Sequence, residues 1–146
     1  MKKVLVMIAV ITAVFLGACV SAKQPAIQDD DIIATPHHNS RSSLDWAGVY
    51  RGVIPSAGYG GIAVELTLNF DGTYVLSYVY LGRSDEVFIS TGTFGWDNSG
   101  NIVILDDEQR PSYYQVAENR VIQLDITGNP ITGELAEHYV LTKASD

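Results

Sequence analysis

The fold is decided by the stretch Ile62-Ala63-Val64-Glu65-Leu66-Thr67-Leu68-Asn69-Phe70-Asp71-Gly72-Thr73-Tyr74-Val75-Leu76-Ser77-Tyr78-Val79-Tyr80-Leu81. In its first half, Val64, Leu66 and Leu68 alternate with Glu65 and other polar residues, which is typical of a strand with one buried face. The middle, Asn69 to Thr73, has the composition of a tight turn and places a glycine where a positive φ is needed. The stretch therefore predicts a β-hairpin.

The second strand of this hairpin carries apolar residues on both faces. They are Tyr74, Leu76, Tyr78 and Tyr80 on one face, and Val75, Val79 and Leu81 on the other. A strand of this kind is usually covered on both sides. We therefore expect apolar cover on both faces.

Runs rich in Val, Ile, Tyr, Phe and Thr continue on either side of the hairpin and predict further strands. The expected strands span 48–54, 62–69, 73–81, 87–96, 102–105, 113–116, 121–125 and 138–142, and Asp97-Asn98-Ser99-Gly100-Asn101 supplies a second hairpin turn. The segment 131–139 hints at a helical turn but is too short to stand alone, so we expect a loop. Short strands in an antiparallel meander favour closure into a small barrel or a heavily curled sheet.

The expected folded domain covers residues 44–146, beginning near Leu44-Asp45-Trp46. Its length of roughly 100 residues is enough for one modest core. Residues 19–43 differ in composition: after the first few they are rich in Gln, Asp, Pro, His and Ser, without a helical or strand period. We expect this segment to be a flexible tether.

The first 18 residues have the pattern of a cleaved signal peptide, with a cationic start and an apolar run that ends in Leu16-Gly17-Ala18-Cys19. The run is about 14 residues long, whereas a membrane-spanning helix needs about 20. Its end resembles the bacterial lipobox, which implies that Cys19 carries the lipid after cleavage. The alternative is an ordinary signal peptide, which would leave the chain's one cysteine as a free thiol in an oxidising compartment.

The lipid has consequences for location. One acyl chain binds a membrane only marginally, so stable anchoring requires a multiply acylated Cys19. In lipoproteins of this kind an Asp after the cysteine resembles a mark for inner-membrane retention, and this chain has Val20. The resemblance implies an outer-membrane protein of a Gram-negative bacterium, facing the periplasm.

The chain is acidic, with a formal net charge of −8 at pH 7. Loss of Lys2 and Lys3 with the signal peptide would leave 7 basic residues against 17 acidic ones. Nucleic acid is therefore excluded as a partner, because phosphate binding needs clustered Lys and Arg. Adsorption to anionic headgroups is disfavoured for the same reason.

Catalytic and metal-binding candidates are few. His37 and His38 lie in the expected tether, where no base can be held precisely, and His138 is expected at the start of the last strand. The many acidic residues show no pair whose surroundings would separate two pKa values. We therefore predict no enzyme and no cofactor. Weak binding of nickel, copper or zinc by His37-His38, together with Asp29-Asp30-Asp31, is the one metal hypothesis.

Short motifs are spread over the whole expected domain. They are Leu44-Asp45-Trp46-Ala47-Gly48-Val49-Tyr50-Arg51-Gly52-Val53-Ile54-Pro55, Gly61-Ile62, Glu65-Leu66-Thr67-Leu68, Asp71-Gly72-Thr73-Tyr74, Gly92-Thr93-Phe94, Trp96-Asp97, Glu118-Asn119-Arg120-Val121-Ile122-Gln123-Leu124-Asp125, Ile131-Thr132-Gly133 and His138-Tyr139-Val140-Leu141. Together they resemble the N-terminal domain of NlpE-type lipoproteins, which are linked to copper resistance and envelope stress in Gram-negative outer membranes.

This resemblance implies a small antiparallel β-barrel with some likeness to bacterial lipocalins. It also implies a role in reporting adhesion, copper or lipoprotein-sorting stress to an inner-membrane sensor kinase. The sequence departs from the family where the family carries a C-x-x-C, because the matching positions are Ser56 and Tyr59. Without thiolates, soft-metal or redox chemistry has no basis at that loop. Longer members also have a second domain, whose role is not carried over.

Three functional hypotheses remain. The first is an outer-membrane lipoprotein that acts through protein contacts, in stress signalling or as a structural envelope module. The second is a barrel that binds a small apolar or amphipathic ligand, motivated by aromatic residues on expected inward faces; these are Tyr74, Tyr78, Tyr80, Phe88, Phe94 and Trp96. The third is weak metal binding by the tether.

Overall fold

The structure is a computed structural model that describes residues 38–58, 60–107 and 112–145. The expected signal peptide, Cys19 and the tether as far as His37 lie outside these residues, as does Tyr59. The description below concerns the compact unit Thr35–Asp146 alone. Among the residues described, none of the helices has the length and apolar character that crossing a membrane requires.

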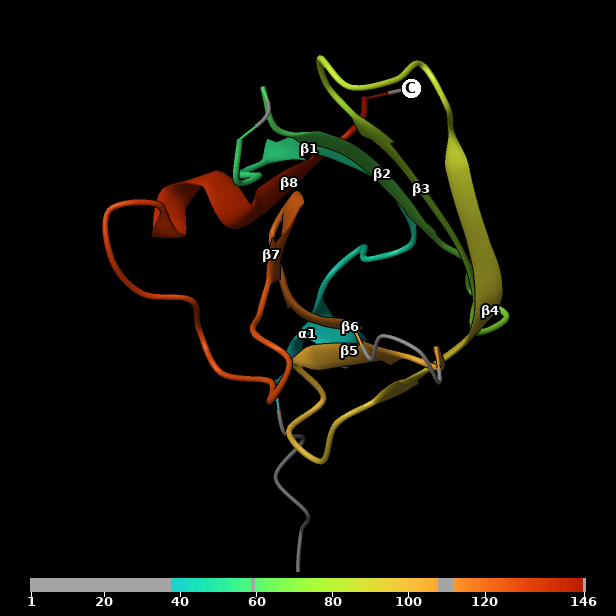
Figure 1. The fold of residues 1–146 in the computed structure, drawn as a ribbon. Helices are drawn as coiled ribbons and strands as arrows, with labels where there is room; N and C mark the ends of the chain where they lie inside the picture. Colours follow the sequence, from blue (N-terminus) through green and yellow to red (C-terminus); the bar gives the residue numbers. More distant parts are fainter. Residues whose placement is uncertain (1–37, 59, 108–111, 146) are drawn as a thin grey trace, which may run out of the picture. The chain divides into compact units, whose positions relative to one another are not determined.

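Eight antiparallel strands form a closed barrel in chain order (Figure 1). They are β1 (Gly48–Ile54), β2 (Ile62–Leu68), β3 (Thr73–Tyr80), β4 (Phe88–Trp96), β5 (Ile102–Leu105), β6 (Ser112–Ala117), β7 (Arg120–Gln123) and β8 (Val140–Lys143). Each strand pairs with the next one, and β8 closes the barrel by pairing with β1 through Tyr50↔Lys143 and Arg51↔Thr142. The all-β fold and the antiparallel meander are confirmed. Because the barrel is closed, the sheet has no edge strand.

The strand predictions are accurate to one or two residues at each end, and both hairpin turns form as expected. Gly72 adopts φ +83° and Gly100 adopts φ +69°, the left-handed conformations for which glycine was expected. The largest differences are of two residues, at the end of β7 and at the start of β8, which begins at Val140. His138, expected at the start of that strand, lies instead in a 3₁₀ turn, η1 (Ala136–Tyr139).

The prediction of a loop over the whole of 131–139 is therefore wrong at its end. The amide of Ala136 donates to the carbonyl of Gly133 (3.1 Å), and that of His138 donates to the carbonyl of Leu135 (3.0 Å). Gly133 has a φ of +102°, which turns the chain before the first of these bonds. A 3₁₀ turn this short depends on contacts with the rest of the fold, and the local sequence does not reveal those contacts.

The core lies inside the barrel, on the inner faces that the alternation in β2 predicts. Val64, Leu66 and Leu68 are buried there. The other members of the core are Tyr50, Tyr74, Val103, Leu105, Tyr114, Val116, Val121 and Leu141. On the outer face of β3 the expectation of apolar cover is not met at Val75, which is 38% exposed. Barrel closure explains this difference, because one face of every strand then points outward.

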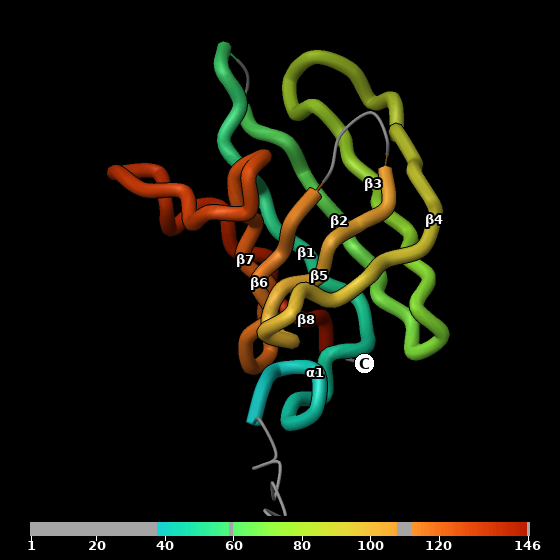
Figure 2. The backbone as a smooth tube through the Cα atoms, turned by 90° about the horizontal axis from the view of Figure 1, so that it is seen from below, coloured from blue at the N-terminus to red at the C-terminus, as the bar shows by residue number. Residues whose placement is uncertain are grey.

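One end of the barrel, here called the base, carries α1 (Ser40–Ser43) and the turns at 69–72 and 97–100 (Figure 2). The amide and hydroxyl of Ser40 both donate to Asn101 Oδ1, at 2.9 and 3.1 Å. The ring of Trp46 packs against Phe70, Phe94 and Trp96, with centroid distances of 5.3, 5.8 and 5.4 Å. Ordered structure therefore begins before Leu44, within the segment expected to be tether.

The opposite end, here called the mouth, is formed by the connections at 54–62 and 81–87 (Figure 2). The chain between β1 and β2 contains Ser56, and the chain between β3 and β4 contains Arg83. Since the base is sealed by its aromatic cluster, the mouth is the end at which the barrel interior meets solvent.

Candidate functional site: a cavity at the mouth of the barrel

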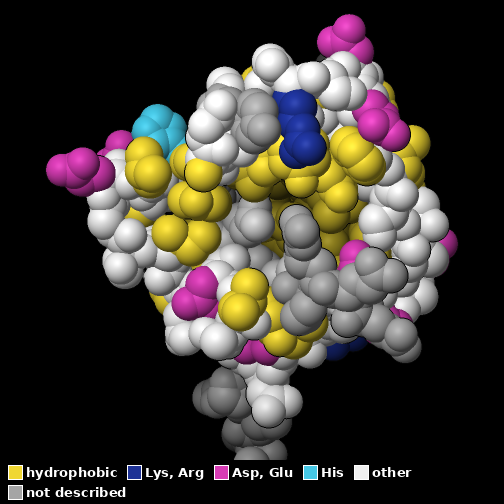
Figure 3. Space-filling view, in the orientation of Figure 1, with side chains coloured by type: hydrophobic (Ala, Val, Ile, Leu, Met, Phe, Trp, Pro, Cys, Tyr) yellow, Lys and Arg dark blue, Asp and Glu magenta, His cyan; other side chains and the backbone are white. Residues whose placement is uncertain are grey.

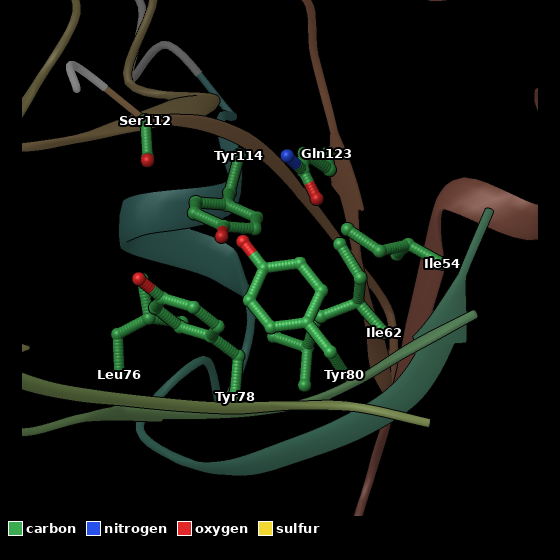
Figure 4. A pocket seen from close by; sticks show the side chains of 9 residues that line it. Ile54, Ile62, Leu76, Tyr78, Tyr80, Ser112, Tyr114 and Gln123 are labelled. Carbon is green, nitrogen blue, oxygen red and sulfur yellow. The ribbon is translucent and has the colours of Figure 1, made fainter. Parts of the chain in front are cut away.

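The barrel interior is not completely filled at the mouth. A cavity of about 70 Å³ lies there, and Figure 3, which looks onto the mouth, shows hydrophobic side chains gathered in the hollow at its centre. The lining residues are Ile54, Ile62, Val64, Leu76, Tyr78, Tyr80, Ser112, Tyr114 and Gln123 (Figure 4). They come from β1, β2, β3, β6 and β7, so the closed barrel assembles the site.

The cavity has polar groups as well as apolar walls. Gln123 Oε1 is buried and has no hydrogen-bond partner among the described residues. Figure 4 shows the side chains of Tyr80, Tyr114 and Gln123 directed into the same space. Burial raises the pKa of the Tyr114 phenol far above its usual value, which the hydrogen bond with Ser112 only partly offsets, so that hydroxyl stays protonated at physiological pH.

An aromatic cluster surrounds the opening. Phe88 stacks on Tyr78 with ring centroids 5.2 Å apart, and it meets the edge of Tyr80 at 5.8 Å. The guanidinium of Arg83 lies 5.8 Å from the centre of the Tyr80 ring, within the range of a cation–π interaction. A second hollow, of about 290 Å³, lies among these side chains and shares Tyr78 and Tyr80 with the inner cavity. The second hollow, here called the vestibule, therefore adjoins the inner cavity at Tyr78 and Tyr80, and Arg83, Ser84 and Glu86 form its polar side.

The aromatic residues expected on inward faces do lie on the inner face of the barrel. Tyr78 faces Phe88 across β3 and β4, and the paired residues of two antiparallel strands share a face. Tyr74 is 2% exposed and belongs to the core. Phe94 and Trp96 pack against the core near the base. The aromatic residues thus fill the barrel at the base and line a space at the mouth.

Ser56, one of the two residues that match the family's C-x-x-C, does not line the inner cavity. Ser56 lines a separate surface hollow together with Gly60, Gly61 and His138. Tyr59 lies outside the described residues. Since no carboxylate lines this hollow, the pair lacks the orienting group that nucleophilic catalysis requires.

The metal hypothesis gains no support from the residues that the structure describes. His38 is exposed, and His37 and Asp29-Asp30-Asp31 lie outside the described residues. Within ranges 38–58, 60–107 and 112–145, no three His, Cys, Asp or Glu side chains are grouped so that they could hold a metal ion. Weak metal binding by the tether stays a prediction.

Sequence reasoning missed Gln123 as a site residue, although a signal was present. Gln123 is two residues after Val121, which is fully buried, so the strand period places both side chains on the inner face. A polar residue at an inward position needs a partner, and this requirement could have identified it. Ser112 was missed because the expected strand began at 113.

Comparisons with known proteins agree with the fold. The family model described as the NlpE N-terminal domain matches residues 50–134. The lipoprotein NlpE of Escherichia coli K12 is 36% identical over 97 residues, which are 65% of this chain and 40% of that protein. The chain thus spans well under half the length of this curated relative.

Two solved structures are also similar. A protein from Shewanella oneidensis, described as a lipoprotein, is 45% identical with a TM-score of 0.67, and the match covers 73% of this chain and 95% of that one. The Cpx pathway activator NlpE from Escherichia coli is 35% identical with a TM-score of 0.52, over 60% of this chain and 46% of that one. The matched family model covers more than half of the barrel-forming chain, and the chain therefore belongs to the NlpE N-terminal domain family.

Proposed function

We propose that the protein is a lipoprotein of the outer membrane, held by Cys19, that acts without catalysis in the envelope stress response through contacts with another envelope protein. The observation that carries this proposal is the family membership of the barrel, together with a lipobox at Leu16-Gly17-Ala18-Cys19. One relative with the same barrel is described as a Cpx pathway activator.

The barrel itself supports a role without catalysis. Among the described residues, His138 shares a surface hollow with Ser56, and none of the residues that line this hollow is a carboxylate. The inner cavity is lined by apolar, hydroxyl and amide side chains. A site of this composition can hold a molecule, but it offers no base with a pKa near neutrality.

The protein can contact a partner in the envelope only if it is held in the right membrane. The first experiment therefore measures its location. The Cys19→Ala variant and the Val20→Asp variant are compared with the wild type by membrane fractionation and by labelling with palmitate. We expect the wild type in the outer membrane, loss of label in Cys19→Ala, and a shift to the inner membrane in Val20→Asp. A matched control is Gln24→Asp, which adds the same charge further along and should leave the location unchanged.

The second experiment measures signalling. The wild type and the Cys19→Ala variant are overproduced in a Gram-negative host that carries an envelope-stress reporter. We expect the reporter to respond to the wild type, and the response to change when the anchor is lost. Equal reporter activity with and without overproduction, and after deletion, would remove the signalling role and leave a structural one.

The serine at position 56, where the family has a cysteine, limits the signals that this loop can detect. A serine at this position cannot supply the thiolate of a C-x-x-C, so we infer that copper does not act through this loop. Adding copper should therefore give the same reporter response in the wild type and in the Ser56→Ala variant.

A further inference from the structure

The inner cavity at the mouth is built for an uncharged molecule. Its walls are aliphatic and aromatic, and none of the lining residues carries a formal charge. An anion placed there would face the lone pairs of Gln123 Oε1 without a cation to balance it, and either sign of charge would lose its hydration. The chemistry of the lining therefore selects neutral ligands.

Gln123 defines what kind of polar group the ligand must have. Its Oε1 atom is buried and unpaired among the described residues, and a buried acceptor without a donor is costly. An acceptor is satisfied only by an O–H or N–H group. Tyr114, which lines the same cavity, already has a hydrogen bond with Ser112. A ligand that donates one hydrogen bond would therefore complete the polar end of the cavity.

The dimensions select a slender molecule. A cavity that holds benzene measures about 150 Å³, about twice the volume of about 70 Å³ found here. A ring therefore does not fit the inner cavity, whereas the end of an unbranched chain does. The remainder of such a chain has room in the vestibule of about 290 Å³, where it can lie along Tyr78, Tyr80 and Phe88; the rest of that hollow is lined by Arg83, Ser84 and Glu86.

We propose that the barrel binds an uncharged, unbranched amphipathic molecule of the alcohol class, with its hydroxyl group donating to Gln123 Oε1 and its chain lying against Tyr78, Tyr80 and Phe88. The lining of this site includes neither Cys19 nor Ser56. It goes beyond the proposed function, because binding requires neither the membrane anchor nor a protein partner.

The first experiment uses two isomers that differ only in the donor. The probes are 1-hexanol and 1-methoxypentane, which have the same atoms, but the ether has no O–H group. The protein is the unit 35–146, which contains the closed barrel with its own core. It corresponds to the Shewanella oneidensis chain that crystallised with 95% of its length in the match.

Binding is followed by two-dimensional NMR titration. We expect saturable shifts for 1-hexanol at residues that line the cavity, and an affinity about tenfold lower for the ether, since the difference is one hydrogen bond to a buried acceptor. Two results would overturn the proposal. One is an affinity for the ether equal to that for the alcohol. The other is a linear, non-saturable response to the alcohol, which would mean that the cavity holds water only.

The second experiment removes the acceptor. In Gln123→Leu, the affinity for 1-hexanol should fall by about tenfold and become equal to that for the ether. The matched control is Gln115→Leu on β6, where the glutamine is exposed on the outer face of the barrel. That variant should keep the preference of the wild type for the alcohol. If Gln123→Leu still prefers 1-hexanol to the ether, Gln123 Oε1 is not the acceptor. If the variant does not fold, the comparison of the two probes on the wild type tests the proposal.

Discussion

At the scale of single residues, Gln123 combines the polarity of a surface residue with the position of a core residue. Its strand neighbour two positions earlier, Val121, is fully buried on the same face. A leucine at position 123 would satisfy the packing without leaving an acceptor unpaired. The native glutamine therefore costs stability, which is common where a residue serves binding.

This cost gives the first prediction. Gln123→Leu should raise the free energy of unfolding of the unit 35–146 by about 1 kcal/mol, because it removes a buried acceptor that has no partner. Urea denaturation measures the change. In the exposed control, Gln115→Leu, the change should stay within about 0.5 kcal/mol. A clear loss of stability in Gln123→Leu would mean that the amide is fully hydrogen-bonded in solution.

Tyr50 gives a second prediction at this scale. Its hydroxyl donates to the carbonyl of Trp46 (2.5 Å), and burial together with the charge of Asp45 raises its pKa from 10.0 to about 12. The folded state thus binds this proton more tightly than the unfolded state. The stability that results is fully present below pH 10 and is lost as the pH rises toward 12.

The Tyr50→Phe variant tests this prediction. It should be less stable than the wild type at pH 8, because the hydrogen bond to Trp46 is lost, and it should lose less further stability between pH 10 and 12. Tyr114, whose pKa burial also raises, keeps part of the pH dependence in both proteins. Unfolding free energies measured from pH 8 to 12 provide the comparison. Parallel curves for the two proteins would show that Tyr50 does not titrate in this range.

At the scale of strands, β1 and the chain of β8 approach each other closely at Gly52. A Cβ atom added at Gly52 would lie 2.7 Å from the carbonyl oxygen of Val140 and 2.7 Å from Cδ2 of Leu141. The backbone oxygen belongs to the closing strand and cannot move without disturbing its pairing with β7. Gly52 is therefore required by the close approach of the two chains.

The third prediction follows from this contact. Gly52→Ala should destabilise the barrel by about 1 to 3 kcal/mol, the usual cost of overpacking. Gly95→Ala on β4 is the matched control, because nothing lies within 4 Å of the Cβ atom added there. It should be neutral or slightly stabilising. Thermal unfolding of both variants measures the difference, and equal melting temperatures would show that β1 and β8 can move apart at no cost.

The elements also show what can be predicted from a sequence. Strand positions followed from a period of two and from turn residues such as Gly72 and Gly100, which act locally. The 3₁₀ turn at Ala136–Tyr139 did not, because the helical tendency of so short a segment is not enough to form a turn without the rest of the fold. The cavity could not be predicted either, since an unfilled volume depends on how side chains from five strands meet.

At the scale of the whole molecule, the base of the barrel forms hydrogen bonds with residues that the sequence assigned to the tether. The hydroxyl of Ser40 donates to the carbonyl of Val116 (2.7 Å), and the amide of Arg41 donates to the carbonyl of Gly100 (3.0 Å). The indole of Trp46 in turn donates to the carbonyl of Arg41 (3.1 Å). A polar segment can be ordered in this way by hydrogen bonds to a finished barrel, which composition alone does not reveal.

The fourth prediction is that these residues are part of the stable domain. A chain of residues 44–146 should be less stable than one of residues 35–146 by about 1 to 3 kcal/mol, because it loses the hydrogen bonds of Ser40 and Arg41 and uncovers Trp46. Urea denaturation followed by tryptophan fluorescence reports both effects, since an uncovered Trp46 emits at a longer wavelength. Asn101→Ala in the longer chain should reproduce part of the loss, because Asn101 Oδ1 accepts both hydrogen bonds from Ser40. Equal stability of the two chains would place the start of the folded domain at Leu44 after all.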